Sequence, residues 1–416
     1  MSSLEEIFST ENILAYSGVC LDLAVEIPET RSLPGKDFDT LVIPSRGAVP
    51  FFLGMAYGLN KLSENFGGVY QDFYQNLGVQ ETMTSLFHED IQLAEKGVNG
   101  KGIRVLLIPF TADLNVERFD PSLDNTEFTT KTRDYWAKVT KSFFKNSQKR
   151  SKDPYFKSFA DFVLRDIEGR DDLAQVYEEF PAINGFSMID TVISGRAAND
   201  ILGSFARLAK REDNPALNPM AFLVVDENGA KLKPNFSRYL TGRRIEGLVK
   251  MYHIPRIVSE DEGASLLGVG AAIYPSVMRM SRDLTFGGEE FFIGAGTWHN
   301  SSDFSGNYFE NFHSFMSMIY AGMDLIYAKN YNGTNGNFEE ETFNDSRKSF
   351  LDRAKKLKIM APTQEDITIF NPSSRYHYEK CYETGSHVLH APFTEKSEEI
   401  ALSKILSLPG VQYSPK

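Results

Sequence analysis

The stretch Ser187-Met-Ile-Asp-Thr-Val-Ile-Ser-Gly-Arg-Ala197 says most about the fold of this chain. Its first half is an apolar strand candidate that contains one acid, Asp190, and its second half is a short Ser/Gly loop. A helical pattern follows at 198–208. A strand that passes through a small loop into a helix directs loop N–H groups and the positive end of the helix dipole toward one point. The stretch therefore predicts an anion site, with a phosphate as the expected ligand.

A second stretch has the same order of elements. The segment 38–44 is a short apolar strand candidate, Ser45-Arg-Gly-Ala48 is a small loop, and a helical pattern follows at 49–59. Gly47 would permit a backbone shape that a side chain forbids, and Arg46 offers a fork of donors that suits a diphosphate. Neither stretch has the glycine spacing of a P-loop or of a dinucleotide-binding fingerprint.

Together the two stretches resemble the type I phosphoribosyltransferases. In that family a strand with two acids and a Thr-Gly-x-Thr-type loop binds ribose 5′-phosphate, and a strand followed by Ser-Arg-Gly-Gly binds pyrophosphate. The resemblance implies Mg²⁺ as cofactor and phosphoribosyl pyrophosphate or a nucleotide as ligand. It implies that Asp190 contacts the ribose hydroxyls. It assigns the 5′-phosphate to Ser194, Gly195, Arg196 and Ala197, and the diphosphate to Ser45, Arg46, Gly47 and Ala48.

Two further expectations concern single residues near these loops. Gly195 should lie where the loop N–H groups converge, so that a side chain there would crowd the phosphate and leave the fold intact. Asp226 ends a strand candidate at a place where the family often presents the group that receives the ribosyl unit. A polar turn without a ligand explains Asp226-Glu-Asn-Gly229 equally well.

The chain departs from the family pattern at two positions. Ile189 stands where the family has its first acid, and Ile193 stands where many members carry an acid that assists base or proton chemistry. These changes affect catalysis more than binding, and the sequence identifies no catalytic residue and no acceptor base. Three functions stay open. They are a glycosyltransferase of the pentosyltransferase class that releases pyrophosphate, a non-catalytic nucleotide sensor or assembly subunit on the same fold, and an unrelated α/β hydrolase. No Gly-x-Ser-x-Gly elbow supports the hydrolase.

The pattern of apolar runs predicts an α/β fold with a mostly parallel sheet flanked by helices. The strand candidates at 38–44, 103–110, 186–193 and 221–226 are short and nearly continuously apolar, which is typical of strands buried on both faces. Helical patterns occur near 132–146, 155–178, 309–329 and 394–408, and 330–350 is expected to form a loop with acidic residues. We expect a phosphoribosyltransferase-like core at 1–300 with a hood-like insertion at about 111–182, and a mainly helical C-terminal extension at 301–416.

Composition restricts the partners and the location. The 416 residues carry a formal net charge of -12, which argues against a nucleic-acid partner but allows a local basic pocket. The two cysteines, Cys20 and Cys381, give no disulfide framework and suit the cytoplasm. No apolar run reaches membrane-spanning length, so no membrane partner is expected, while a homo-oligomer or a protein assembly stays open.

No histidine shows metal-ligand spacing. The acidic run 259–262 could hold Mg²⁺, although an acidic helix start explains it equally well.

Overall fold

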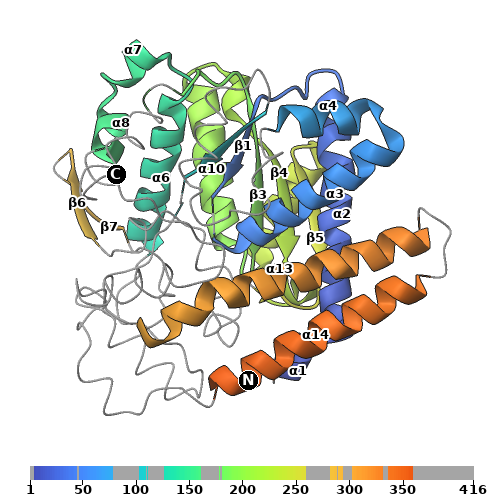
Figure 1. Ribbon diagram of the computed structural model, residues 1–416. Coiled ribbons are helices and arrows are strands. Elements are labelled where there is room, and N and C mark those ends of the chain that lie inside the picture. Colours follow the sequence, from blue (N-terminus) through green and yellow to red (C-terminus); the bar gives the residue numbers. More distant parts are fainter. Residues whose placement is uncertain are drawn as a thin grey trace, which may run out of the picture.

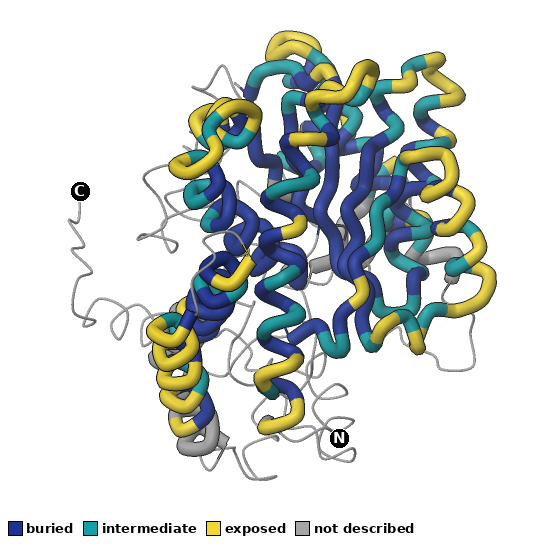
Figure 2. The backbone as a smooth tube through the Cα atoms, turned by 90° about the vertical axis from the view of Figure 1, so that its right-hand side faces the viewer, coloured by how far each residue is buried: buried dark blue, intermediate teal, exposed yellow. Residues whose placement is uncertain are grey.

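Five parallel strands form the centre of the computed structural model of this chain, in the order β2-β1-β3-β4-β5 (Figure 1). The model describes residues 4–44, 46–77, 103–108, 110, 126–160, 178, 180–258, 282–287, 289–293, 302–330 and 336–358. The strands are β1 (Thr40–Ile43), β2 (Arg104–Leu107), β3 (Phe186–Val192), β4 (Met220–Val225) and β5 (Val249–His253). The predicted α/β class, the parallel sheet and the four predicted strands are confirmed. β1, β3 and β4 are buried at every position, and Figure 2 shows the central strands in dark blue.

Helices cover both faces of the sheet. One face carries α6 (Thr126–Ser142), α10 (Arg196–Arg211) and α11 (Pro234–Ile245). On this face Phe186 of β3 packs on Phe205 of α10, with ring centroids 4.8 Å apart. The other face carries α2 (Thr10–Ser32), α3 (Val49–Phe66) and α4 (Gly68–Asn76). This division follows from the strand order, because right-handed crossovers that run in opposite directions along a sheet place their helices on opposite faces.

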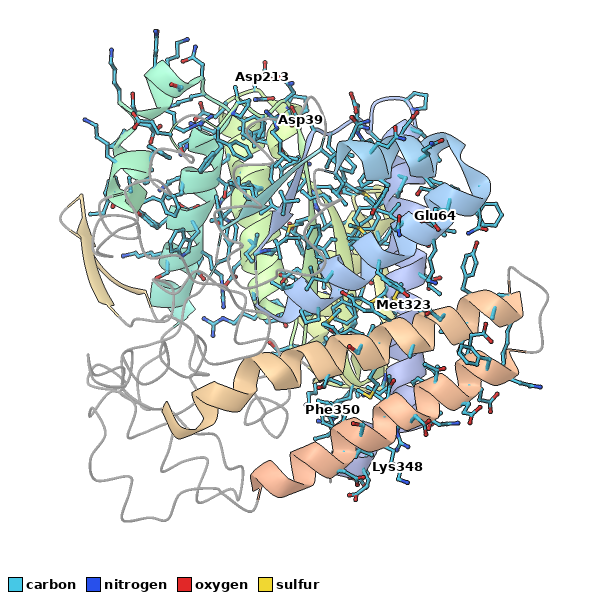
Figure 3. All side chains as sticks on the ribbon, viewed as in Figure 1. Asp39, Glu64, Asp213, Met323, Lys348 and Phe350 are labelled. Carbon is cyan, nitrogen blue, oxygen red and sulfur yellow. The ribbon has the colours of Figure 1, made fainter. Side chains whose placement is uncertain are left out.

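The direction of the strand order reverses between β1 and β3. The chain moves from β1 outward to β2, returns past β1 to β3, and then continues the other way to β4 and β5. In doubly wound sheets, ligands bind outside the carboxyl ends of the strands at such a switch point. Asp39 precedes β1 and Asp213 precedes β4, and both lie at the upper end of the molecule in Figure 3. The carboxyl ends of β1 and β3 therefore lie at the opposite edge.

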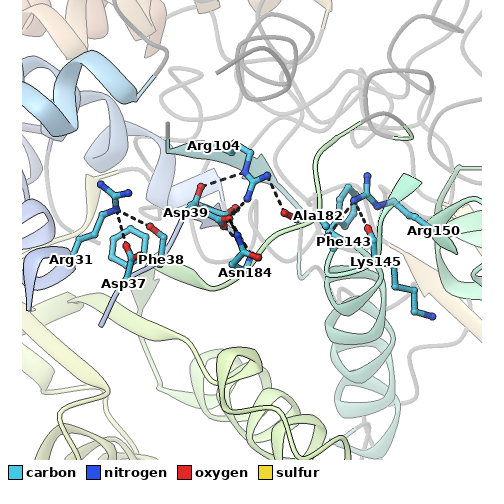
Figure 4. Close-up of polar contacts among 11 residues, drawn as sticks. Arg31, Asp37, Phe38, Asp39, Arg104, Phe143, Lys145, Arg150, Ala182 and Asn184 are labelled. Atoms are coloured by element: carbon cyan, nitrogen blue, oxygen red, sulfur yellow. Dashed lines mark hydrogen bonds and ion pairs between the residues drawn. The ribbon is translucent and has the colours of Figure 1, made fainter. Parts of the chain in front are cut away.

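Arginines form ion pairs and hydrogen bonds at the edge of the sheet where the parallel strands begin, called here the amino edge (Figure 4). Arg104 forms an ion pair with Asp39, whose carboxylate also accepts the backbone N–H of Asn184 at 3.1 Å. Arg150 is fully buried and donates to the backbone carbonyls of Glu178, Phe180, Phe143 and Lys145. Burial, with a smaller contribution from Arg104, lowers the pKa of Arg150 to about 10, so the guanidinium stays charged at neutral pH. These contacts fix the segment that leads into β3.

α13 (Ser302–Asn330) packs on the helical layer of α2 and α3, and α14 (Asn337–Lys358) packs on α13. α13 confirms the helix predicted at 309–329 and contacts both α2 and α3. The hydroxyl of Ser17 in α2 donates to the carbonyl of Ile319 at 3.0 Å. The loop predicted over 330–350 is wrong, because α14 (Asn337–Lys358) runs through it. Its buried apolar residues are few, and Phe343, Phe350 and Leu351 stand among acidic and polar positions.

The remaining elements are short. They are α1 (Leu4–Ile7), η1 (Arg46–Ala48), α7 (Ser147–Arg150), α8 (Pro154–Phe159), η4 (Pro215–Leu217), η5 (Asp226–Gly229) and an antiparallel hairpin of β6 (Arg282–Phe286) and β7 (Glu289–Ile293). The prediction at 132–146 matches α6. The prediction at 155–178 overlaps α8, but 161–177 lies outside the described residues, as does the helix predicted at 394–408.

α2 and α3 cross at a glycine. A side chain on Gly54 would overlap the Sγ of Cys20, and the same Cβ would lie only 2.8 Å from the Cβ of Cys20. Protein interiors are close-packed, so such a contact forces the two helices apart. In contrast, Gly242 in α11 has no neighbouring heavy atom within 4 Å of an added Cβ.

We predict opposite effects for the same substitution at these two glycines. Gly54→Ala should lower the free energy of unfolding by about 1–3 kcal/mol through overpacking. Gly242→Ala should leave the stability unchanged or raise it by up to about 1 kcal/mol, because alanine favours a helix interior. Urea denaturation of both variants measures this. A Gly54→Ala protein as stable as Gly242→Ala would contradict the close crossing of α2 and α3.

Candidate functional site

The loop after β3 ends in a left-handed glycine. Gly195 has φ 82° and ψ -5°, is buried, and is the N-cap residue of α10. The backbone N–H of Arg196 donates to the Oγ of Ser194 at 3.4 Å. The next two N–H groups of the helix, those of Ala197 and Ala198, have no acceptor within the described part of the chain. The first turn of α10 contains no acid. This helix end thus offers N–H donors and the positive end of a 16-residue dipole to an anion.

The sequence predicts that a side chain at position 195 would crowd a phosphate, but in the structure it would crowd neighbouring protein atoms. An added Cβ would lie 3.0 Å from the Cβ of Phe236 and 3.1 Å from the Cδ2 of Leu232, so it would meet α11 and the segment before it. The positive φ adds strain for any residue with a side chain. A side chain at Gly195 is therefore expected to lower the stability of the fold, an effect that the sequence did not predict.

The two predicted loops follow neighbouring strands. β1 and β3 pair in parallel, with Val42 opposite Met188, so their carboxyl ends lie at the same edge. The predicted residues Gly47 and Ala48 are buried in η1 and at the start of α3. Arg46 begins η1, and its side chain, like the whole of Ser45, lies outside the described residues. The structure thus brings 46–48 and 194–197 to one edge of the sheet.

Asp190 lies on the face of β3 that is covered by α10. Side chains alternate along a strand, so Asp190 shares its face with Phe186, which packs on α10. Its carboxylate is 2% exposed and accepts the backbone N–H of Thr191 at 2.9 Å. Ile189, at the position of the family's first acid, is fully buried. The site therefore holds one strand carboxylate close to the loop.

Asp226 serves a structural purpose in the next turn. It is 3% exposed, and its Oδ1 accepts the backbone N–H of Ile257 at 2.7 Å, which ties the chain after β5 to the end of β4. The following residues Glu227 and Asn228 have left-handed φ values of 46° and 51°. Such strain in residues other than glycine is common near functional sites. Lys233, just before α11, donates its backbone N–H to the carbonyl of Ser194 at 3.2 Å, so this segment contacts the loop after β3.

A protein-held Mg²⁺ finds few open ligands among the described residues. No group of three or more His, Cys, Asp or Glu side chains occurs there that could hold a metal ion. Glu227 lies 3.0 Å from the Nζ of Lys231 and 3.2 Å from the Nη1 of Arg256, so its charge is already balanced. The acidic run 259–262 lies outside the described residues.

Sequence reasoning missed an arginine from α6. The Nη1 of Arg133 lies 2.8 Å from the Oδ2 of Asp200, which sits one turn into α10. The Nε of Arg196 lies 3.9 Å from the same oxygen, and the hydroxyl of Thr130 donates to it at 3.4 Å. The spacing of Arg196 and Asp200 is visible in the sequence. The approach of Arg133 is not, because it depends on how α6 packs against α10 (Figure 1).

No protein-family model matches this chain, and no match was found among curated proteins or solved structures. The resemblance to phosphoribosyltransferases therefore stays a prediction that rests on the two sequence stretches and on the geometry around them. Within the described part of the chain, no helix combines the length and the apolar character needed to cross a membrane. The predicted cytoplasmic location stays a prediction.

We predict that Gly195 stabilises the fold as well as shaping the loop. Gly195→Ala should lower the free energy of unfolding by about 1–3 kcal/mol, through left-handed strain and contact with α11. Gly203→Ala in the same helix is the matched control. It has no positive φ, its added Cβ comes no closer than 3.4 Å to the Nη1 of Arg207, and it should be neutral or slightly stabilising. Equal stability of the two variants in urea would refute this role for Gly195.

Proposed function

We propose that this protein binds phosphoribosyl pyrophosphate or a nucleotide through its 5′-phosphate, at the carboxyl edge of the sheet between β1 and β3. The observation that supports this most directly is the position of the two loops, 46–48 and 194–197, on neighbouring strands at the reversal of the strand order. The two sequence patterns resemble two different motifs of one family, and both precede a helix. A phosphate at one loop and a diphosphate at the other would lie on opposite sides of one ribose.

Different residues of the site bind different parts of the ligand. The N–H groups at the start of α10 bind the 5′-phosphate, and the carboxylate of Asp190 accepts hydrogen bonds from the ribose hydroxyls. Arg46 and the backbone of Gly47 and Ala48 bind the diphosphate, which carries its magnesium as substrate. In a transferase, the bond between ribose C1 and the diphosphate oxygen breaks, pyrophosphate leaves with the electron pair, and an acceptor forms the new bond to C1. The donors around the diphosphate stabilise the charge that develops on it.

A non-catalytic nucleotide sensor is the second candidate. The position of the family's first acid is occupied by Ile189, an apolar residue that cannot accept hydrogen bonds from ribose hydroxyls. A pocket with one carboxylate can hold ribose without promoting the departure of pyrophosphate. Binding and turnover are therefore separate questions for this chain.

The test is calorimetric titration with phosphoribosyl pyrophosphate and Mg²⁺, followed by an assay of pyrophosphate release with purine, pyrimidine and nucleotide acceptors. Arg46→Ala should weaken binding by about 1.5–3 kcal/mol, as expected for a charge-assisted hydrogen bond. Asp190→Asn should weaken binding of ribose 5-phosphate and leave inorganic phosphate binding unchanged, because only the ribose contact is lost.

Each outcome selects one function. Binding with release of pyrophosphate supports the transferase, and binding without release supports the sensor. No binding of phosphoribosyl pyrophosphate or of any nucleotide refutes the proposal and favours an unrelated α/β enzyme. If Asp190→Asn mainly lowers the free energy of unfolding, Asp190 is a structural residue and its role at the ribose is wrong.

A further inference from the structure

β5 is the outermost strand on its side of the sheet. In a parallel pair, alternate residues direct their backbone groups toward the neighbouring strand. The N–H of Ala221 in β4 donates to the carbonyl of Leu248 at 2.9 Å, so the even-numbered residues of β5 face β4. The backbone groups of Met251 and His253 point outward and have no hydrogen-bond partner within the described part of the chain. Native proteins protect such open strands, often by covering them.

An acidic helix flanks the outer side of β5 on one face of the sheet, where α2 stands beside the strand (Figure 1). The hydroxyl of Tyr252 donates to Glu26 of α2 at 3.1 Å, and Lys250 forms an ion pair with the same carboxylate. Burial and the charges of Glu26 and Asp22 raise the pKa of the Tyr252 hydroxyl, so both acids lie beside β5. α2 contains no lysine or arginine before Arg31.

Asp22 and Glu26 stand one turn apart on α2 and carry like charges. Burial and the charge of Glu26 raise the pKa of Asp22, because the two carboxylates repel each other. Like charges at this spacing destabilise a helix. Asp22 is exposed and has no ion-pair partner among the described residues, since Lys250 pairs with Glu26. A cation from outside the chain would relieve this repulsion.

On the opposite face of the sheet, α11 flanks the same strand. The N–H of Leu248 donates to the carbonyl of Arg243 at 3.0 Å, which joins the end of α11 to the start of β5. Burial raises the pKa of Tyr239, whereas the charges of Arg243 and of Arg207 in α10 lower it, so Tyr239 lies on the side of α10. Arg244 follows Tyr239 by five positions, or about 140° around the helix, and therefore lies away from α10.

The outer surface of α11 is basic. Arg238 and Arg244 are exposed, and neither has an ion-pair partner within the part of the chain that the structure describes. Arg243, in contrast, is buried and donates to Glu246 and Asn218. The outer side of β5 thus has an unpaired acid on one face of the sheet and unpaired arginines on the other.

We infer that the outer side of β5 binds a second copy of this chain, with α2 of each copy against α11 of the other. Rotation by 180° about an axis parallel to the strands exchanges the two faces of the sheet. It therefore brings the acids of one copy to the arginines of the other, and the same contact occurs twice. Rotation about an axis perpendicular to the sheet would instead place acid against acid and arginine against arginine. The inference concerns assembly and does not depend on the proposed ligand.

The test is sedimentation velocity of the full chain over a range of concentrations. The wild type should form a dimer that weakens as salt rises, because exposed charge pairs are screened. Asp22→Lys and Arg244→Glu should each weaken the dimer by about tenfold or more, since each reversal places like charges together at two symmetric contacts. Arg207→Glu is the matched control and should leave the dimer unchanged, because Arg207 is exposed but lies beside Asp134 on the side of α6.

A mixture of the two reversed variants tests the arrangement of the copies. Asp22→Lys and Arg244→Glu mixed in equal amounts should form a mixed dimer close to wild-type affinity, because both contacts again join opposite charges. The double variant that carries both reversals should dimerise with itself for the same reason. Urea denaturation shows which variants are folded. Asp22→Asn or Arg244→Gln replaces any reversal that unfolds the chain, and should still weaken the dimer.

Three results would overturn the inference. The first is a wild-type chain that stays monomeric at every concentration. The second is a dimer that neither reversal weakens, or that the mixture does not restore, since the contact would then lie elsewhere on the surface. The third is a dimer that Arg207→Glu weakens as much as Arg244→Glu does, because the overall charge and not this contact would then control association.

Discussion

The left-handed backbone at Gly195 is the constraint on which the rest of the site depends. It turns the chain from a fully buried strand into α10 within three residues, and it leaves no room for a side chain between this loop and α11. Because the turn is tight, the first N–H groups of α10 point outward at the carboxyl edge, beside the end of β1. Arg196 and Asp200 take their places from the same helix start. One backbone conformation thus positions the donors, the charges and the neighbouring helix together.

The two edges of the sheet differ in their hydrogen bonding. At the amino edge Arg104 and Arg150 donate to carboxylate and carbonyl oxygens of the chain itself, and these bonds hold the segment that enters β3. At the carboxyl edge, the N–H groups of Ala197 and Ala198 have no acceptor within the described part of the chain.

The core of the fold was predictable because its strands are continuously apolar, and the rest was not because it depends on contacts distant in sequence. β1 to β4 are buried on both faces, so no polar residue interrupts the pattern enough to hide them. β5 lies at the edge of the sheet, where Lys250 and Met251 are half-buried and His253 is exposed, and its pattern was not recognised. The loop residues at the site were found from their order along the chain. The contact of Gly195 with α11 and the approach of Arg133 to Asp200 join elements that no local pattern connects.

The packing of α2 against α13 also sets an order of events during synthesis. Ser17 and Ile319 are hydrogen-bonded across 302 positions of sequence, and α2 is buried along much of its length by α3 and α13. A ribosome that adds about 5–20 residues per second needs roughly 15–60 seconds to make that much chain. For that time the apolar side of α2 has no α13 to cover it, although α3 can already pack there. The layer that α2 begins is therefore completed only after α13 has been made, so α2 spends this interval without one of the two helices that bury it.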